Sequence, residues 1–446
     1  MFRKILSNRL SLRLGSVLLL TALLVMPLFA SLPARAQGSW EMVASGLNNP
    51  RGLTFAPNGA LYVAEAGTGG PNCYALDPSD PTALTCIGTT GSITRVWKGQ
   101  QSRVVNGLVS LADPSGFGSL GPTDISFKNP ALASIVVGLG ADPRERDELA
   151  STVNPLFGNL GHLVKMVSPN NKWQYTADVS AYEVVANPDG EDPAQGGIDS
   201  NPYAVNSDGG KIIVADAGGN DLLKVMQVNN ISTLAVFPPA TWVVPDPPPF
   251  PGLPPPGTPI PVDAVPTSVV KGPDGYYYVG QLASISVDDA NVYRIPPGGG
   301  EPEEYVSGLT AIIDVAFAPD GSLYVLEIFK NGLLAGELFG DLTGSLLHVA
   351  TDGTITEIAS EGLTAPGGLA VGPDGSIYVS NFSIFPGAGE VVRISPDYRP
   401  GDAPAAPSAA APGLPSGSIL KLFGIDLNKL AAPQLDFSAR LPMIQR

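Results

Sequence analysis

Histidine is nearly absent from this sequence, which has only His162 and His348 among its 446 residues. Two histidines exclude a His-rich metal site and argue against a Ser-His-Asp catalytic triad, and we interpret both as structural. The sequence also contains no G-x-S-x-G nucleophile elbow, no phosphate-binding loop and no dinucleotide-binding fingerprint. The standard catalytic arrangements are therefore missing.

Charged residues are also few, at 15%, and the basic ones are scarcer than the acidic ones. There are 25 Lys and Arg against 41 Asp and Glu, which gives a formal net charge of −16. This acidic balance argues against nucleic acid or an anionic membrane surface as a partner. The 52 glycines and 45 prolines suit a turn-rich all-β protein without long helices.

Only two cysteines occur, Cys73 and Cys86. Two thiols without a nearby histidine provide half of a tetrahedral metal site, and a catalytic dithiol normally has a tighter spacing. In an exported chain, the natural expectation is a disulfide that closes a short surface loop.

Residues 1–36 have the pattern of a signal peptide. A positively charged start is followed by an apolar stretch over Leu14–Ala30 and by the small-residue cleavage site Ala34-Arg35-Ala36. The alternative is a retained membrane anchor, but the stretch is shorter than the roughly 20 residues that a spanning helix needs, and Pro27 interrupts it. Cleavage after Ala36 changes the net charge from −16 to −21, because five basic and no acidic residues are removed. We expect a periplasmic or secreted protein, of bacterial origin, with no stable membrane span.

The rest of the chain is organised as a repeat, which is clearest over Ala365–Asp397. There the apolar run Leu369–Val371 is followed by Pro373-Asp374-Gly375 and then by an alternating run from Ile377. Pro presets φ, Asp bonds the local backbone and Gly adopts a positive φ, so this tripeptide predicts a tight turn between antiparallel strands. Similar units open at Asn49, Gly121, Asn201, Val265, Ala311 and Ala365.

Six units spaced about 46–80 residues apart, each long enough for four strands, predict an all-β fold, a six-bladed β-propeller. One four-stranded sheet cannot bury its two apolar faces alone, whereas sheets packed around an axis bury them and limit the exposed edges.

The closure of the ring can also be predicted. Fourth strands that end in Gly-Leu occur at Ser102–Leu108, Glu303–Leu309 and Ile355–Leu363, but the last unit has none. The same ending, Glu41–Leu47, precedes the first unit. We therefore predict that the N-terminal strand Trp40–Ala44 completes the sixth blade. The propeller domain is expected to span residues 37–398.

Three connecting loops are distinctive. Ala141–Gly158 carries a charged run and is expected to hold one short helix. Val244–Val262 is strongly Pro-rich and is expected to be a stiff polyproline II loop on the surface. Lys330–Thr343 is rich in apolar residues and is a candidate lip over one face of the ring.

Residues 399–446 differ in composition from the repeats. Arg399–Ser418 is a Pro/Ala/Gly-rich linker, and Ile419–Leu430 has apolar residues at roughly helical spacing. We interpret the segment as a poorly ordered tail. The alternative is that Ile419–Leu430 is a short amphipathic docking element.

One polar position recurs at the end of the predicted second strand in five units. A ring of such side chains would suit a cation or the hydroxyls of a sugar-like ligand. Each side chain would equally well cap the backbone amides of its own loop, and we favour caps. Three more polar residues lie near the starts of the innermost strands. Together the ligand or cation candidates at the channel mouth are Glu65, Asp216, Gln281, Glu327, Asn381, Asp124, Asn201 and Asp314.

Ile212–Val225 and Gly372–Asn381 resemble the repeats of NHL-type six-bladed propellers. Over about residues 40–397 the chain resembles the ScyD/ScyE family of exported cyanobacterial propellers. The shared features are the signal peptide, the opening SGLNNPRGLTFAPNGALYVAEAG and the paired cysteines in TGGPNCYALDPSDPTALTC. The resemblance implies a periplasmic location and, in some members, an association with biosynthesis of the pigment scytonemin.

Two functions follow as hypotheses. The favoured one is an exported, non-catalytic binding or scaffold protein that holds a small molecule or a periplasmic protein, as an accessory to scytonemin-type biosynthesis. The alternative is a metal-dependent hydrolase or lactonase, which rests on a distant resemblance to the gluconolactonase family and its divalent cation. In that case Glu65, Asn201 and Asp216 would hold Ca²⁺ or another divalent cation, although they lie outside that family's local motifs.

Overall fold

The computed structural model describes residues 40–76, 81–168, 170–190, 197–227, 230–249, 251–282, 285, 287–396 and 398. The predicted signal peptide and the tail from residue 399 lie outside the described residues. No helix within the described ranges is long and apolar enough to cross a membrane.

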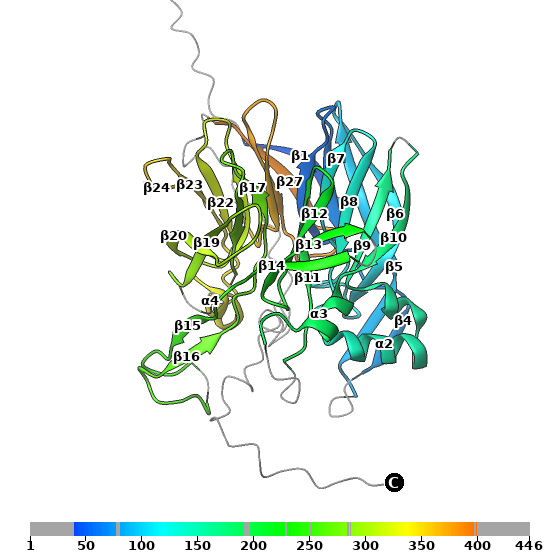
Figure 1. Ribbon diagram of the computed structural model, residues 1–446, viewed down its shortest axis with the longest axis horizontal. Helices are drawn as coiled ribbons and strands as arrows, with labels where there is room; N and C mark the ends of the chain where they lie inside the picture. Colours follow the sequence, from blue (N-terminus) through cyan, green and yellow to red (C-terminus); the bar gives the residue numbers. More distant parts are fainter. Residues whose placement is uncertain are drawn as a thin grey trace, which may run out of the picture. The chain divides into compact units, whose positions relative to one another are not determined.

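Six antiparallel sheets are arranged as the blades of a propeller, which Figure 1 shows from the side. Each innermost strand contacts that of the next blade, and the last contacts the first, so the ring is closed. The innermost strands are β2 (Pro50–Phe55), β7 (Pro122–Asn129), β11 (Pro202–Asp208), β17 (Val270–Lys271), β21 (Ile312–Phe317) and β25 (Gly368–Val371).

The outer strands follow in meander order. The second strands are β3 (Leu61–Glu65), β8 (Leu132–Val137), β12 (Lys211–Asp216), β18 (Tyr277–Gly280), β22 (Leu323–Glu327) and β26 (Ile377–Asn381). The third strands are β5 (Leu84–Trp97), β9 (His162–Val167), β13 (Asp221–Gln227), β19 (Ala290–Ile295), β23 (Ser345–Val349) and β27 (Gly389–Ile394). The fourth strands are β6 (Gln100–Ala112), β10 (Lys172–Asp178), β14 (Asn230–Val236), β20 (Glu303–Leu309) and β24 (Ile355–Ala359).

The sixth blade takes its fourth strand from the N-terminal side of the chain. β1 (Trp40–Leu47) pairs antiparallel with β27, with Trp40 opposite Ile394 and Leu47 opposite Gly389. Leu47 is fully buried. The predicted closure of the ring by an N-terminal strand is therefore confirmed.

The tight turns form as predicted from their residues. In the sixth blade, Gly375 has a φ of +77°, and the Asp374 carboxylate accepts a hydrogen bond from the Ser376 N–H at 3.1 Å. The turn holds β25 and β26 in register, with Val371 opposite Ile377. We call the end of the ring that carries these turns between first and second strands the turn face.

The core lies between neighbouring blades. Both faces of each sheet are covered, so a second strand such as β3 is buried at all five positions instead of alternating. Aromatic pairs join adjacent blades, including Tyr62 with Phe127 and Phe55 with Tyr378, whose ring centroids are 4.7 and 4.9 Å apart.

The long connections gather at the opposite end of the ring, which we call the loop face (Figure 1). The sequence predicted a helix in one of these connections, and α2 confirms it, with Asp142 accepting a hydrogen bond from the Arg144 N–H at its start. The elements of this face are β4 (Asn72–Ala75), α2 (Pro143–Thr152), the 3₁₀ helix η1 (Pro155–Asn159), α3 (Ser180–Ala186), β15 (Ala240–Val243), β16 (Pro259–Val262) and α4 (Leu333–Phe339).

The Pro-rich loop differs in part from its prediction. We expected polyproline II structure throughout Val244–Val262, but Pro259–Val262 forms β16 and pairs with β15. Trp242 on β15 is 1% exposed and packs near Ile260. Prolines at alternate positions leave the intervening amides free to pair, as in an edge strand, and burial of the tryptophan stabilises the hairpin.

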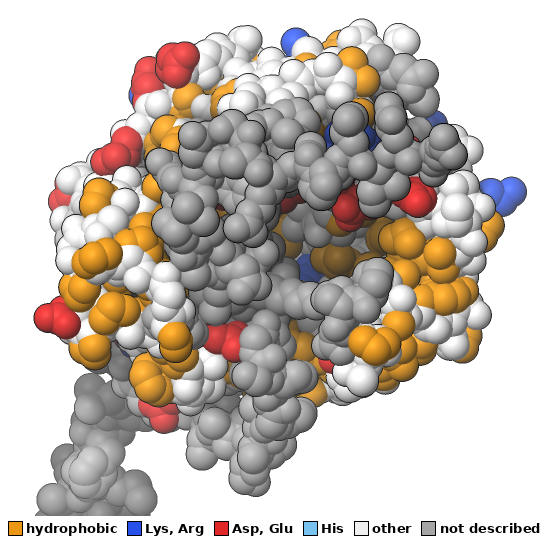
Figure 2. Space-filling view, turned by 90° about the horizontal axis from the view of Figure 1, so that it is seen from below, with side chains coloured by type: hydrophobic (Ala, Val, Ile, Leu, Met, Phe, Trp, Pro, Cys, Tyr) orange, Lys and Arg blue, Asp and Glu red, His pale blue; other side chains and the backbone are white. Residues whose placement is uncertain are grey.

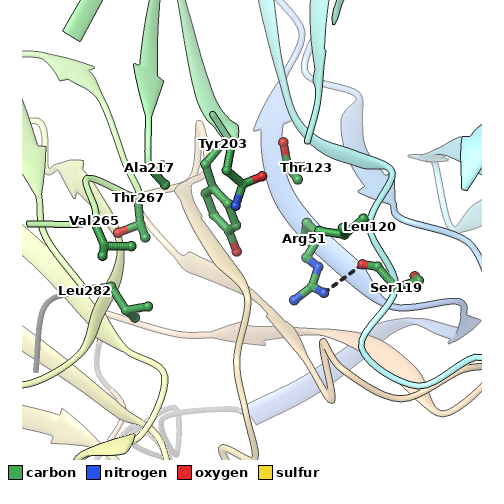
Figure 3. Close-up of a pocket in the computed structure, with 10 residues that line it drawn as sticks. Arg51, Ser119, Leu120, Thr123, Tyr203, Ala217, Val265, Thr267 and Leu282 are labelled. Atoms are coloured by element: carbon green, nitrogen blue, oxygen red, sulfur yellow. Dashed lines mark hydrogen bonds between the residues drawn. The ribbon is translucent and has the colours of Figure 1, made fainter. Parts of the chain in front are cut away.

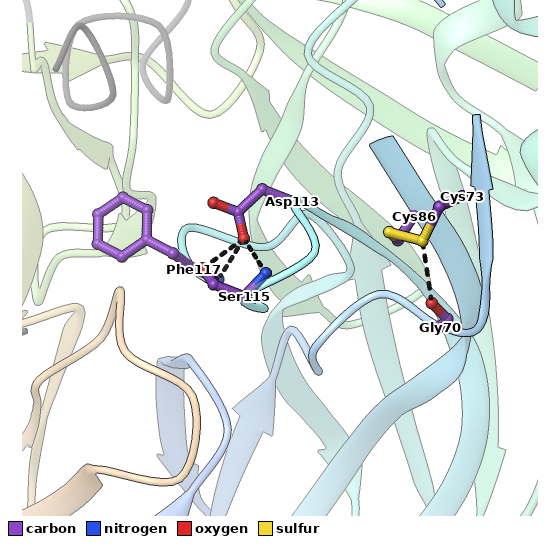
Figure 4. Close-up of a disulfide and its surroundings, with 6 residues drawn as sticks. All are labelled: Gly70, Cys73, Cys86, Asp113, Ser115 and Phe117. Carbon is purple, nitrogen blue, oxygen red and sulfur yellow. Dashed lines mark hydrogen bonds between the residues drawn. A yellow bond between two sulfur atoms is a disulfide. The ribbon is translucent and has the colours of Figure 1, made fainter. Parts of the chain in front are cut away.

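The disulfide between Cys73 and Cys86 is present, as predicted (Figure 4). The two cysteines lie directly opposite each other on β4 and β5. The disulfide therefore fastens the extra hairpin strand β4 to the long third strand of blade one.

Candidate functional site

The polar residues at the ends of the second strands are all buried. In four blades, the side chain accepts a hydrogen bond from a backbone N–H just before the inner strand of its own blade. The pairs are Glu65 with Asn48 N–H (2.8 Å), Asp216 with Asn201 N–H (2.6 Å), Glu327 with Thr310 N–H (2.8 Å) and Asn381 with Thr364 N–H (2.7 Å). This is the backbone-capping role that the sequence favoured. A ligand role for these residues stays a prediction.

Glu65 has further partners. Its carboxylate pairs with the Arg103 guanidinium at 2.7 Å and accepts a hydrogen bond from the Thr94 hydroxyl at 2.5 Å. A cation at Glu65 would have to compete with both groups.

Asp216 is equally occupied. It accepts hydrogen bonds from the Ser200 hydroxyl at 2.6 Å and from the Gly218 and Gly219 N–H groups at 3.2 Å, while burial raises its pKa. The third residue of the hypothetical cation set, Asn201, accepts a hydrogen bond from the Leu139 N–H at 3.2 Å. In the described part of the chain, no group of three or more His, Cys, Asp or Glu side chains is arranged to hold a metal ion.

Gln281 occupies the corresponding position in the fourth blade but makes no cap. Its side chain is fully buried, and within the described ranges neither its amide oxygen nor its amide nitrogen has a hydrogen-bond partner. The repeat therefore conserves the burial of this position in all five blades, and the cap in four of them.

Asp124 and Asp314 link neighbouring innermost strands. Asp124 accepts hydrogen bonds from the Ile125 and Val205 N–H groups at 2.7 and 2.8 Å. Asp314 does the same with Val315 and Leu369, both at 2.8 Å. Each carboxylate thus ties its strand to the next blade.

Burial shifts both carboxyl groups. It raises the pKa of Asp124 to about 7, and it raises the pKa of Asp314 well above the usual range, with Asp124 adding to the shift. Gly52 occupies the equivalent position in blade one, where a side chain would collide with the Asp124 carboxylate. Close packing of the inner strands therefore depends on this glycine.

At the position just before Gly52, Asp124 and their counterparts in the other blades, a different set of side chains faces the channel. Four residues of this set line a cavity of about 20 Å³ at the loop-face end of the channel (Figure 3). Each of them directly follows a proline, and they are Arg51, Thr123, Tyr203 and Thr267. We call it the channel cavity. Seen from the loop face, the molecule is hollowed near its middle, with basic side-chain atoms deep inside (Figure 2). A cavity of this size holds about one water molecule or the end group of a larger ligand.

Arg51 is the charged group of the channel cavity. It is 3% exposed, and its Nη2 donates a hydrogen bond to the Ser119 carbonyl oxygen at 3.1 Å. Among the described residues, no carboxylate lies within ion-pair distance of its guanidinium. Burial lowers the pKa of Arg51, but an arginine remains charged in a protein. The cavity therefore contains a buried positive charge that is not paired with an anion from the described part of the chain.

The carbonyl that receives Arg51 is positioned by a turn in the preceding loop. The Asp113 carboxylate accepts hydrogen bonds from the N–H groups of Ser115 and Phe117, at 2.7 and 3.2 Å (Figure 4). Ser119 follows two residues later, and its hydroxyl donates to the Gly67 carbonyl oxygen at 2.8 Å.

Tyr203 provides a second polar group. Its hydroxyl and the Arg51 guanidinium extend into the same space and interact electrostatically (Figure 3). Among the described residues, the hydroxyl has no hydrogen-bond partner at normal geometry. Burial raises the pKa of Tyr203, so the phenol stays protonated and can donate. Two donors thus meet in one small space.

The sequence analysis did not select Arg51 or Tyr203. The signal was available, because the aligned inner strands carry Arg51, Thr123, Tyr203, Thr267, Ile313 and Gly367 at this position. An arginine among small, apolar and hydroxyl side chains at one level of a channel marks a candidate anion site.

No protein-family model and no curated protein matches the chain. Virginiamycin B lyase from Staphylococcus aureus is 12% identical, over 80% of this chain and 99% of the lyase, with a TM-score of 0.38. The calcium-binding protein regucalcin from Agrobacterium tumefaciens is 12% identical, over 82% and 97%, with a TM-score of 0.42. A putative gluconolactonase is 12% identical, over 80% and 93%, with a TM-score of 0.40. The finer resemblance to the ScyD/ScyE family stays a prediction.

Proposed function

We propose that this protein is an exported, non-catalytic binding propeller that receives a carboxylate group of its ligand in the channel cavity. The observation that carries the proposal is Arg51, a buried guanidinium without an anionic partner among the described residues. A buried charge is costly unless it is paired. A ligand carboxylate would supply the missing charge.

The geometry favours a carboxylate. The planar fork of an arginine matches the two oxygens of a carboxylate, and such charge-assisted hydrogen bonds are about twice as strong as neutral ones. The Tyr203 hydroxyl provides a further donor in the same space. Because the cavity measures about 20 Å³, only the end group enters, and the body of the ligand lies toward the loop face.

Binding is better supported than catalysis. The Thr123 hydroxyl donates to the carbonyl oxygens of Val136 and Pro202, and the Thr267 hydroxyl donates to those of Gly280 and Ile312. The hydroxyl groups that could act as nucleophiles are thus engaged with backbone. The channel cavity holds donors for an anion.

The setting of this function follows from the sequence. The signal-peptide pattern and the disulfide support an oxidising compartment, the periplasm or the exterior. The ScyD/ScyE resemblance supports an accessory role in secondary-metabolite biosynthesis, with an acidic small molecule as the ligand.

The test uses the mature chain, residues 37–446, with acetate as the probe and acetamide as its uncharged match. We expect acetate at tens of millimolar to raise the melting temperature at constant ionic strength, and acetamide to leave it unchanged. Arg51→Gln is expected to abolish the acetate effect, whereas Arg144→Gln on the loop face retains it. Tyr203→Phe is expected to weaken binding by roughly tenfold to a hundredfold, as for one lost hydrogen bond to a charged group.

Two outcomes would overturn the proposal. One is an equal effect of acetate and acetamide on the wild type, and the other is an undiminished acetate effect in Arg51→Gln. If Arg51→Gln does not fold, Tyr203→Phe is used in its place, and an undiminished acetate effect in that variant would overturn the proposal. A separate titration with Ca²⁺ after chelation tests the hydrolase alternative, since a Ca²⁺-dependent shift lost in Glu65→Gln would favour it.

A further inference from the structure

The turn face has a pocket of its own, at the end of the ring opposite to the channel cavity. It has a volume of about 370 Å³, and every residue that lines it is Phe, Ala, Pro, Val or Gly. The lining comes from the turns of three adjacent blades. These turns are Phe55-Ala56-Pro57 with Gly59, Phe317-Ala318-Pro319 and Val371-Gly372-Pro373. We call it the turn-face pocket.

The apolar character is confined to these blades. At the position of Ala56 and Ala318, blade two has Lys128, and blade three has the charged Asp208 in its turn. Blade four has Lys271 at the end of its inner strand, paired with Asp208 at 2.8 Å. The turns of the fifth, sixth and first blades therefore differ from the others in a way that the repeat itself does not require. Apolar surface at one place on a ring of otherwise polar turns indicates a binding surface.

The chain leaves the described residues beside this pocket. Pro396 lies against the turn of the sixth blade, since a Cβ built on Gly375 would be 3.8 Å from Pro396 Cγ. Two residues later, the Tyr398 ring packs on Trp40, with ring centroids 5.8 Å apart. The last described residues before Arg399–Ser418, Pro396 and Tyr398, thus lie on the turn face.

The composition of that segment matches the pocket. Arg399–Ser418 contains five prolines and six alanines and one apolar residue of larger size, Leu414. Proline-rich segments adopt the polyproline II helix, which loses little entropy on binding and docks in grooves lined by aromatic side chains. Phe55 and Phe317 supply such rings.

We propose that the turn-face pocket binds the chain's own Pro/Ala-rich segment Arg399–Ser418 in a polyproline II conformation. The segment is tethered beside the pocket, so its effective concentration is on the order of millimolar, and a weak intrinsic affinity suffices. At about 3.1 Å per residue, a few residues span a pocket of this size. Docking would cover the apolar turns of blades five, six and one.

The experiment compares the mature chain, residues 37–446, with the same chain ended at Tyr398. A synthetic peptide of residues 399–418 is titrated into the shortened protein by calorimetry, and hydrogen exchange is measured for both proteins. We expect the peptide to bind, and we expect the amides of the three lining turns to exchange faster after the truncation. A peptide in which the five prolines are replaced by alanine is expected to bind at least about tenfold more weakly, because it loses the preformed helix.

Matched variants locate the site. Ala318→Lys places in the pocket the residue that blade two carries at the same position, so the turn is expected to fold. It is expected to weaken peptide binding about tenfold or more, because a charge is brought against an apolar surface. Lys128→Ala, outside the pocket, is expected to leave binding unchanged.

The proposal is overturned if the peptide does not bind or if Ala318→Lys has no effect. It is also overturned if removal of the tail changes hydrogen exchange elsewhere but not at the three lining turns. Dimerisation of the shortened protein through these three turns would overturn it as well. Should the shortened chain not fold, Ala318→Lys in the mature chain decides the matter, since it is expected to accelerate exchange in residues 399–418. These outcomes are independent of whether acetate binds near Arg51.

Discussion

Trp40 and Tyr398, the first and last residues that the structure describes, pack against each other with ring centroids 5.8 Å apart. Trp40 begins β1 and lies opposite Ile394 of β27, so the two ends of the ring meet within one sheet. A circular fold closed in this way transmits the loss of its closing strand to every blade, because each blade is packed between two others.

Deletion of the closing strand is therefore expected to be severe. A mature chain that begins at Asn48 instead of residue 37 loses β1, including the buried side chains of Ala44 and Leu47. We expect a loss of more than about 4 kcal/mol in unfolding free energy, or no folded protein, in denaturant titrations. A chain that begins at Trp40 is the control and is expected to match the mature protein. Equal stability of all three chains would contradict the closed ring described here.

The disulfide is expected to stabilise a local part of the molecule. Cys73 and Cys86 close a short loop in β4 and β5, outside the ring of inner strands. The double variant Cys73→Ser/Cys86→Ser should lose about 2–4 kcal/mol if β4 unfolds together with the blade. If β4 opens alone, exchange in Asn72–Ala75 should rise while the melting temperature stays constant. Hydrogen exchange and calorimetry on one sample distinguish the two cases, and no change in either would show that β4 is held by its hydrogen bonds.

Most of the fold was predictable because it repeats. Pro373-Asp374-Gly375 and its counterparts fix tight turns by local chemistry, and the missing fourth strand of the last unit pointed to β1. The Pro-rich hairpin β15–β16 was missed because its pairing depends on burial of Trp242, a tertiary contact.

The site was harder to predict than the fold. Strand-end residues such as Glu65 and Asp216 stand out in an alignment of the units because the repeat reuses them as caps. Arg51 occurs at its position in one unit only, so a search for repeated polar residues passes over it. Its importance comes from its burial without a paired anion among the residues that the structure describes, which the sequence alone does not show.

The stability of the protein is expected to be highest near pH 4. Burial raises the pKa of Asp124 and of Glu327 to about 7 in the folded state. Their unfolded values are near 4, so the folded state binds more protons between about pH 4 and 7, and stability falls as the pH rises through this range.

Other carboxyl groups act in the opposite direction at lower pH. Their burial is outweighed by hydrogen bonds and ion pairs, which lower the folded-state pKa, so they destabilise the fold only as the pH falls below about 4. They include Asp142, Asp178, Asp208, Asp274 and Asp374. Denaturant titrations from pH 3 to pH 8 give the profile. Glu327→Gln, which keeps an acceptor for the Thr310 N–H, is expected to flatten the fall above pH 5, and an unchanged slope would argue against its elevated pKa.

The last prediction concerns Asp221, which lies opposite Asp216 across β12 and β13. Asp221 is fully buried, and neither of its carboxylate oxygens has a hydrogen-bond partner among the residues that the structure describes. Burial raises its pKa well above the usual range, and the carboxylates of Asp216, Glu183 and Asp189 add to the shift. Folding therefore favours the protonated form of this carboxyl group, and its ionisation as the pH rises opposes folding.

Asp221→Asn replaces the acid with a neutral side chain of the same shape. At pH 4 the variant and the wild type should have similar stability, because both side chains are uncharged in the folded state. At pH 8 the variant is expected to be more stable by on the order of 1–3 kcal/mol, since the wild type must keep a proton or bury a charge. Asp216→Asn is the matched control. It loses an acceptor for the Ser200 hydroxyl or for backbone N–H groups, and it should be less stable than the wild type at both pH values. A gap between Asp221→Asn and the wild type that does not widen as the pH rises would show that Asp221 is already ionised in the folded protein.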